Sequence, residues 1–202
     1  MSPKEVEAKK QDLAMLKKWA EMGLITLMYL DESGCCPQSP LVYSYGEVGK
    51  QKIVRQKERR GRRINIMGVW EPDRKLEYGL IGCSLNAQRY IQFLDAQAKQ
   101  ASKRLFETGQ FTVIVNDNAS IHRASKAKER QSYWEKQGLL IFFQASYNPQ
   151  MNRMEDQWLH LKRDELRGRV FQDEYDLVEG IIEGMKHRGE QGGFEVERFI
   201  FN

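Results

Sequence analysis

Hydrophobic residues recur along the chain at two spacings, and each spacing predicts a different kind of element. A helical spacing is typical of amphipathic helices, which we place at 3–22, 86–105, 123–137, 152–166 and 174–187. Short apolar runs rich in branched and aromatic side chains are typical of buried strands, which we place at 25–30, 64–71, 75–82, 111–115 and 139–143. Gly23 stands where glycine favours a helix end. The turn-like sequence Asp-Glu-Ser-Gly should end the first strand.

The order of these elements predicts the fold class. Only Pro72, Asp73 and Arg74 separate the second and third strands, which is a hairpin signal. The last two strands are each reached through a helix, which favours crossover connections. We therefore expect an α/β fold with a mixed five-stranded sheet and helices on both faces. A ribonuclease H-like (RNase H-like) fold has this order.

Composition adds a constraint through the placement of charge. The 202 residues suit one domain, with 41% hydrophobic residues for a core, and the formal net charge of +4 does not by itself require a nucleic-acid partner. One segment, however, combines a single acid, Glu58, with eight basic residues: Lys50, Lys52, Arg55, Lys57, Arg59, Arg60, Arg62 and Arg63. Such a segment favours contact with a phosphate backbone, although a solvated loop is the alternative.

Cysteine usage and hydropathy indicate a reduced, non-membrane setting. Three cysteines do not form a disulfide framework. The chain opens with polar residues rather than a signal peptide, and the apolar run Leu24–Leu30 is too short to cross a bilayer. We expect a cytoplasmic protein without a membrane partner.

Two acidic residues follow predicted strands directly. Asp31 comes after the first strand, and Asp117 comes one residue after the strand 111–115. If these strands are parallel and adjacent, their carboxyl ends meet where open α/β sheets place their sites. Two carboxylates there repel each other unless a cation such as Mg²⁺ neutralises them. Both acids also suit ordinary turns, and Glu32 is a weaker candidate ligand.

A third acid, Glu155, has two competing explanations. Asn152 is a natural helix N-cap, which puts Glu155 at the third helical position, where a glutamate stabilises a helix start. Glu155 also lies beside an apolar stripe that includes Met154 and Trp158, so it could equally reach inward to a metal ion. The residues alone leave both explanations open.

Three segments together resemble a known family. They are LDESG (30–34), NDNASIH (116–122) and YNPQMNRMEDQW (147–158), and they agree in order and spacing with the DDE transposases of the mariner superfamily, especially the bacterial insertion-sequence branch. The resemblance covers roughly residues 24–166. Two positions depart from the family pattern: Arg153 replaces the usual proline, and Asn148 stands where serine is common. Arg153 could change the helix start or add a phosphate contact.

The resemblance implies a catalytic site as well as a fold. Asp31, Asp117 and Glu155 would bind two Mg²⁺ ions, with Mn²⁺ as a substitute, for cleavage of DNA and transfer of the freed 3′ end in cut-and-paste transposition. Supporting roles fall to Asn118, His122 and Asn152, although a purely structural role for His122 is equally open. Arg123, after the second motif, joins the basic segment as an expected DNA contact.

The same resemblance suggests a domain division and partners. Residues 1–23 would be a linker helix and 24–202 the RNase H-like catalytic domain. Expected partners are transposon-end and target DNA, a second copy on paired ends, and a separate helix-turn-helix polypeptide, in a nucleoid-associated setting. A split or truncated gene would explain the short N-terminal region. The alternatives are a catalytically silent relic that binds DNA or a partner, or another RNase H-like nuclease.

Two smaller expectations concern residues outside the triad. A zinc site built on His160 and Asp156 is disfavoured, because the HExxH pattern is absent and such a pair is usually a surface contact. Trp70, Trp134 and Trp158 are expected in the core rather than stacked on bases.

Overall fold

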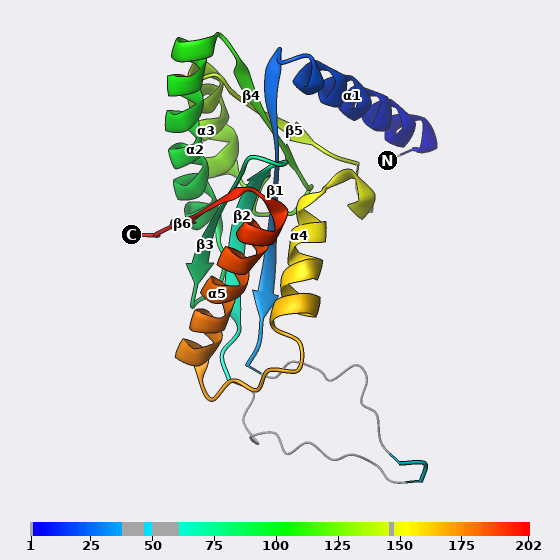
Figure 1. Cartoon of the computed structure of the whole chain (residues 1–202). Helices are drawn as coiled ribbons and strands as arrows, with labels where there is room; N and C mark the ends of the chain where they lie inside the picture. Colours follow the sequence, from blue (N-terminus) through cyan, green and yellow to red (C-terminus); the bar gives the residue numbers. More distant parts are fainter. Residues whose placement is uncertain (1, 38–46, 50–60, 146–147) are drawn as a thin grey trace.

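The computed structural model describes residues 2–37, 47–49, 61–145 and 148–202, and its centre is one six-stranded sheet (Figure 1). The strands are β1 (Ile25–Cys35), β2 (Ile64–Glu71), β3 (Lys75–Ile81), β4 (Phe111–Asn116), β5 (Leu139–Phe143) and β6 (Glu195–Phe199). Their order across the sheet is β5-β4-β1-β2-β3-β6. Strands β1, β2 and β3 form an antiparallel meander, whereas β4 is parallel to both β1 and β5, and β6 is parallel to β3. The mixed sheet confirms the expected fold class.

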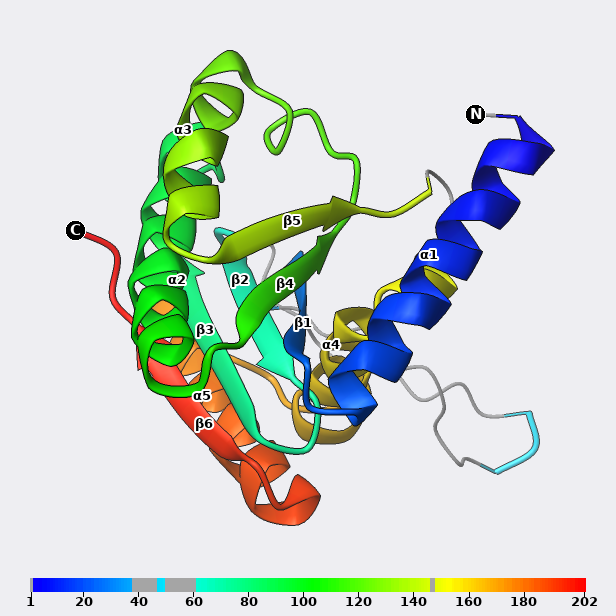
Figure 2. The same cartoon turned by 90° about the horizontal axis from the view of Figure 1, so that it is seen from above.

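Helices cover both faces of this sheet. They are α1 (Pro3–Glu21), α2 (Ala87–Thr108), α3 (Ser125–Lys136), α4 (Met154–His160) and α5 (Glu174–Gly192). Residues of α2 and α3 share one buried cluster with one side of the strands, and residues of α1, α4 and α5 share a second cluster with the other side. In the view from above, α1 lies in front of α4 on this second face (Figure 2). The alternating side chains of β1 therefore contribute to two cores.

Two features of the sheet differ from the sequence prediction. Strand β1 does not end at residue 30, because the Asp-Glu-Ser-Gly segment pairs with β2 as far as Cys35 opposite Ile64. Strand β6 is an additional sixth strand that hydropathy does not reveal, since Glu195, Glu197 and Arg198 interrupt any apolar run. In both cases, pairing with a distant strand decides the structure rather than the local sequence.

The last predicted helices also differ in detail. The helix expected at 152–166 begins at Met154 and changes after His160 into a π-helical turn, Leu161–Glu165. Trp70, Trp134 and Trp158 are all buried, which confirms their assignment to the core. None of the described helices is both long and apolar enough to cross a membrane.

Candidate active site

The first two acidic residues of the predicted triad lie level with each other at the end of β4. Strands β1 and β4 are adjacent and parallel, with Tyr29 opposite Val115. Asp31 and Asp117 each follow this pair by two residues, so the register brings them to the same edge. Strand β4 stops at Asn116 while β1 continues, which opens the sheet beside Asp31. This arrangement confirms the expected parallel pairing of the two strands, although β1 does not end at Asp31 as predicted.

Asp31 is under strong electrostatic repulsion. Its burial raises its pKa, and the negative charges of Glu32, Glu155 and Asp117 raise it further, to about 8. A hydrogen bond from the Glu32 backbone opposes these effects only in part. Three other carboxylates therefore lie within electrostatic reach of Asp31 at the open end of the sheet. A bound cation would remove the repulsion that raises this pKa.

Asn152 fixes the third acid, Glu155, relative to β1. The buried Asn152 amide donates a hydrogen bond from Nδ2 to the Leu30 carbonyl oxygen at 2.7 Å, and its Oδ1 accepts one from the Met154 backbone at 3.1 Å. One side chain thus binds the first residue of α4 and ties it to the residue before Asp31, although the N-cap position of the helix is Arg153 and not the predicted Asn152. Glu155 is the second residue of α4 rather than the third, and it is exposed. Burial and the charges of Asp156 and Asp117 raise its pKa.

Asp117 belongs to a chain of three side chains centred on His122. The Nδ1 atom of His122 lies 2.7 Å from Oδ1 of Asp117, and its Nε2 atom lies 2.6 Å from Oε1 of Glu32. Burial disfavours a charged imidazole, but the bonds to Asp117 and Glu32 outweigh it and raise the pKa of His122 to about 9. A protonated His122 therefore donates to both carboxylates. The Tyr90 ring lies against it, with 4.4 Å between centroids.

The bridge from Glu32 through His122 to Asp117 keeps Asp117 ionised and oriented. Burial acts to raise its pKa, but hydrogen bonds from His122 and from the Ala119 backbone lower it overall. Both bonds reach Oδ1, so Oδ2 has no hydrogen-bond partner in the described part of the chain. Sequence reasoning considered Glu32 only as a weaker ligand and missed its role as the partner of His122. Glu32 faces away from Asp31 because neighbouring strand residues alternate between faces.

The remaining polar residues of the second motif hold the loop after β4. The Asn118 amide donates a short hydrogen bond to the Gln144 carbonyl oxygen, which ties this loop to the chain after β5. The Asn116 amide donates to the Tyr90 hydroxyl at 2.7 Å, and its own oxygen accepts from the Asp117 backbone. Asn118 is therefore engaged in the framework of the site.

The three carboxylates fit a hard divalent cation in the kind of donor they offer. Across the described segments of the chain, however, no three His, Cys, Asp or Glu side chains lie close enough together to hold a metal ion. Asp31, Asp117 and Glu155 are thus electrostatic neighbours that do not share one coordination sphere in this arrangement. His160, which was considered with Asp156 as a zinc ligand, instead pairs with Asp164, with 2.8 Å between His160 Nδ1 and Asp164 Oδ2.

Most of the expected DNA contacts fall outside the described residues, namely Lys50, Lys52, Arg55, Lys57, Arg59 and Arg60. Arg62, Arg63 and Arg123 are described and exposed. The Arg63 guanidinium lies across Gly34, so closely that a β-carbon added to this glycine would overlap its Nε atom. This position brings Arg63 to the part of β1 that extends past the end of β4.

Comparison with known proteins identifies the family of the chain. A sequence model of the family described as DDE superfamily endonuclease matches residues 26–178, which is about three quarters of the chain. No curated protein matches the sequence.

Solved structures share the fold. The Mos1 transposase paired-end complex with left transposon end superposes with a TM-score of 0.64 at 16% identity, covering 96% of this chain and 61% of that one. The Mos1 mariner paired-end complex with Mn gives 0.63 at 17% identity, covering 96% and 62%. The catalytic domain of Mos1 mariner transposase gives 0.56 at 14% identity, covering 96% and 92%. The chain thus spans about 61% of the longer transposase chains that it matches.

Proposed function

Because the chain belongs to the DDE superfamily of endonucleases, we propose that it is the catalytic domain of a cut-and-paste transposase. The observation that supports the proposal is the strand register that brings Asp31 and Asp117 to the same edge of the sheet, with Glu155 within electrostatic reach of Asp31. Parallel β1 and β4 place the first two, and Asn152 attaches the start of α4 to β1 beside them. The raised pKa of Asp31 supports a site built to receive positive charge.

The chemistry of the proposed site is a displacement at phosphorus. Two Mg²⁺ ions, or Mn²⁺ in their place, would supply the charge that stabilises this displacement. Asp117 is held by His122 with Oδ2 left to bind, and Asp31 and Glu155 complete the acidic set. Water attacks first to cut a strand, and the freed 3′-hydroxyl then attacks target DNA, so that no covalent protein nucleophile is required.

The proposed partners follow from these two steps. Joining two transposon ends requires two copies of the catalytic domain on paired DNA ends. We further propose that a separate helix-turn-helix polypeptide recognises the transposon ends and binds them together with this chain.

Cleavage of DNA by the purified chain tests the proposed function. Supercoiled plasmid incubated with Mg²⁺ or Mn²⁺ should become nicked or linear, and chelation of the metal by EDTA should stop the reaction. Glu155→Gln, which removes one charge from the site, should reduce the rate by at least about 100-fold. Equal rates for wild type and variant would remove Glu155 from the triad. DNA binding without cleavage by the wild type would favour a silent relic instead.

A glycine variant tests the DNA contact expected of Arg63 without changing its charge. In Gly34→Ala the new β-carbon should displace the Arg63 guanidinium, which is the far end of a flexible side chain, so the strand itself should remain intact. We expect weaker DNA binding. The slope of log affinity against log salt concentration should become shallower by about 0.9, which is the value for one lost phosphate contact. Fluorescence anisotropy of a labelled duplex over a salt series measures both.

The matched control is Gly82→Ala, because a β-carbon there meets nothing within 4 Å. Neither glycine has a positive φ, so alanine adds no backbone strain at either position. If both variants keep the wild-type salt dependence, the Arg63 guanidinium does not contact DNA from its position over Gly34.

A further inference from the structure

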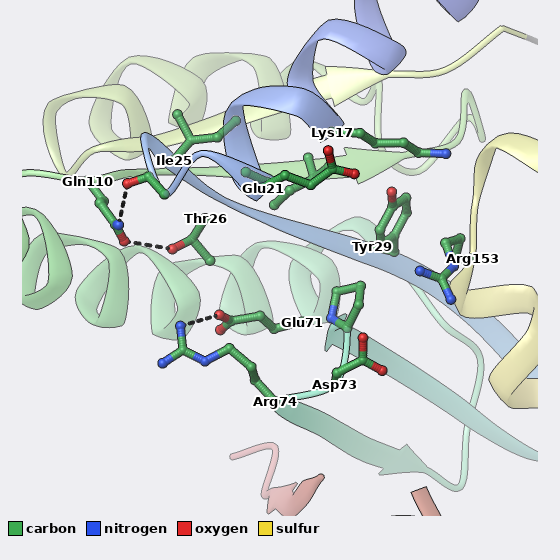
Figure 3. A pocket seen from close by; sticks show the side chains of 14 residues that line it. Lys17, Glu21, Ile25, Thr26, Tyr29, Glu71, Asp73, Arg74, Gln110 and Arg153 are labelled. Atoms are coloured by element: carbon green, nitrogen blue, oxygen red, sulfur yellow. Dashed lines mark hydrogen bonds and ion pairs between the residues drawn. The ribbon is translucent and has the colours of Figure 1, made fainter. Parts of the chain in front are cut away.

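A cavity of about 410 Å³ lies on the α4 face of the sheet, outside the carboxylate site (Figure 3). Its walls come from the end of α1, the first part of β1 and the turn between β2 and β3. Figure 3 shows Lys17, Tyr29 and Arg153 at one end of this cavity, and Thr26, Gln110 and Arg74 toward the other. The two ends differ in how their charges are balanced.

The cations at the Arg74 end already have an acidic partner. Glu71 accepts hydrogen bonds from Arg74 at 3.2 Å and from Arg104 at 3.3 Å. Two further carboxylates line the middle of the cavity, Glu21 beside Lys17 on α1 and Asp73 on the turn between Arg74 and Arg153 (Figure 3). An additional anion would gain little at the Arg74 end, because Arg74 is already bound to Glu71.

The Arg153 end offers two cations without acidic partners. Within the described part of the chain, neither Lys17 nor Arg153 forms an ion pair or a side-chain hydrogen bond. Arg153 is nevertheless held in place, since its guanidinium carbon lies 5.0 Å from the centre of the Trp70 ring. An arginine that stacks on an aromatic face keeps its N–H groups free at the edge, where they can grip a phosphate with two hydrogen bonds.

A phenol group lies beside these cations. Tyr29 lines the same end of the cavity as Arg153 and Lys17 (Figure 3). Its phenolic hydroxyl can donate a hydrogen bond to a phosphate oxygen. The Arg153 guanidinium, the Lys17 ammonium and the Tyr29 hydroxyl can together donate hydrogen bonds to a phosphate group and neutralise its charge.

This end of the cavity lies next to the proposed catalytic carboxylates. Tyr29 precedes Asp31 by two residues on the same face of β1, a separation of roughly 7 Å. Arg153 likewise precedes Glu155 by two residues at the start of α4. Neighbouring phosphates on one DNA strand are separated by a similar distance, roughly 7 Å, which exceeds the rise of about 3.4 Å per nucleotide along the helix axis. A strand with one phosphate at the carboxylates would thus carry a nearby phosphate past Arg153.

We propose that Arg153, with Tyr29 and Lys17, forms a binding site for a DNA backbone phosphate adjacent to the one that is cleaved. The inference rests on the proposed function, because it takes its DNA strand from the carboxylate site. The site orients the strand through one charge-assisted contact and does not take part in bond breaking. A proline at position 153 would provide neither the charge nor the hydrogen bonds.

The salt dependence of DNA binding tests this site without any metal ion. A labelled duplex of arbitrary sequence is titrated with the chain in EDTA over a range of salt concentrations. Arg153→Gln should make the dependence of log affinity on log salt shallower by about 0.9, as expected for one lost phosphate contact. Arg153→Lys should keep most of this slope, because it keeps the charge.

The matched control is Arg74→Gln. Arg74 lines the same cavity and carries the same charge, but it is paired with Glu71, so its loss should leave the slope unchanged. An unchanged slope in Arg153→Gln overturns the proposal. A slope that falls equally in both variants also overturns it, because only net charge would then matter. Thermal melting of each variant checks that it is folded, so that a changed slope can be assigned to DNA binding.

Cleavage kinetics separate this inference from the proposed function. If wild type cleaves DNA, Arg153→Gln should raise KM for DNA several-fold and change kcat much less, as expected for a contact that binds substrate. Normal cleavage together with an unchanged salt slope and KM rejects the phosphate site alone. Failure of wild type to cleave rejects the proposed function, while the slope measured in EDTA still decides the phosphate site.

Discussion

Replacing Asp31 with asparagine should abolish metal-dependent DNA cleavage and, in the absence of metal, make the protein more stable. The loss of cleavage is expected to be at least about 100-fold, because Asp31 supplies charge at the centre of the acidic site. The gain in stability has a separate cause. Burial and the charges of Glu32, Glu155 and Asp117 raise the pKa of Asp31 to about 8, so its ionised form is disfavoured in the folded protein.

The sign of the stability change follows from the direction of this pKa shift. The unfolded chain releases the Asp31 proton near its ordinary pKa of 3.8, whereas the folded protein keeps it until about pH 8. The folded state therefore loses stability as pH rises from about 4 to about 8. Asparagine has a similar size and no charge, so at pH 8 and above we expect a gain of about 1–3 kcal/mol. This corresponds to a melting temperature higher by roughly 3–10 °C.

Thermal melting with and without Mg²⁺ measures both consequences. Mg²⁺ should stabilise wild type, because a ligand that binds only the folded state raises its stability, and it should stabilise Asp31→Asn much less. The control is Asp12→Asn on the exposed side of α1, which should change neither the melting temperature nor the response to Mg²⁺. A lower melting temperature for Asp31→Asn in EDTA would show that the site is not strained by repulsion.

The meeting of Asp31 and Asp117 could be predicted from the sequence because it depends on short, strongly apolar strands. Each acid follows such a strand, and a helix between the strands favours their parallel pairing. The continuation of β1 could not be predicted in the same way. Asp-Glu-Ser-Gly suits a turn, and only the seven-residue pairing with β2, from Tyr29–Trp70 to Cys35–Ile64, makes it a strand.

The attachment of Glu155 shows the same limit at a single side chain. The sequence predicts Asn152 as the N-cap of this helix, whereas the structure has Arg153 at the N-cap and Asn152 one residue earlier, with its oxygen accepting from the Met154 backbone. The other half of the amide donates to Leu30, which is 122 residues away along the chain. Local helix physics explains why an asparagine is favourable there, but it contains no information about the distant carbonyl that fixes Glu155 beside Asp31.

The bridge from Glu32 through His122 to Asp117 was equally invisible in the sequence. Glu32 and His122 lie 90 residues apart, and a histidine after a turn suits a cap or a core position as well as a bridge. The structure decides the matter because His122 is buried between two carboxylates. Its function in the proposed site is to position Asp117, and this role leads to a second prediction with a large effect.

His122→Phe should destabilise the fold and slow DNA cleavage together. Phenylalanine keeps the ring that packs against Tyr90, but it removes the cation shared by Glu32 and Asp117. Because the Asp117 side chain is 38% exposed, water relieves part of the cost, and we expect a loss of about 1–3 kcal/mol near neutral pH. Cleavage should fall by about 10- to 100-fold, since Asp117 loses the partner that orients it.

The dependence of stability on pH identifies the cause of this loss. The pKa of His122 rises on folding from 6.5 to about 9, so its contribution is fully present below about pH 6.5 and disappears as pH rises through about 9. Urea unfolding should therefore show a large difference between wild type and His122→Phe at pH 6 and a small one above pH 9. Asp31→Asn provides the contrast, because its advantage over wild type increases with pH up to about 8 and then stays constant. A difference between wild type and His122→Phe that is independent of pH would mean that His122 contributes by packing alone.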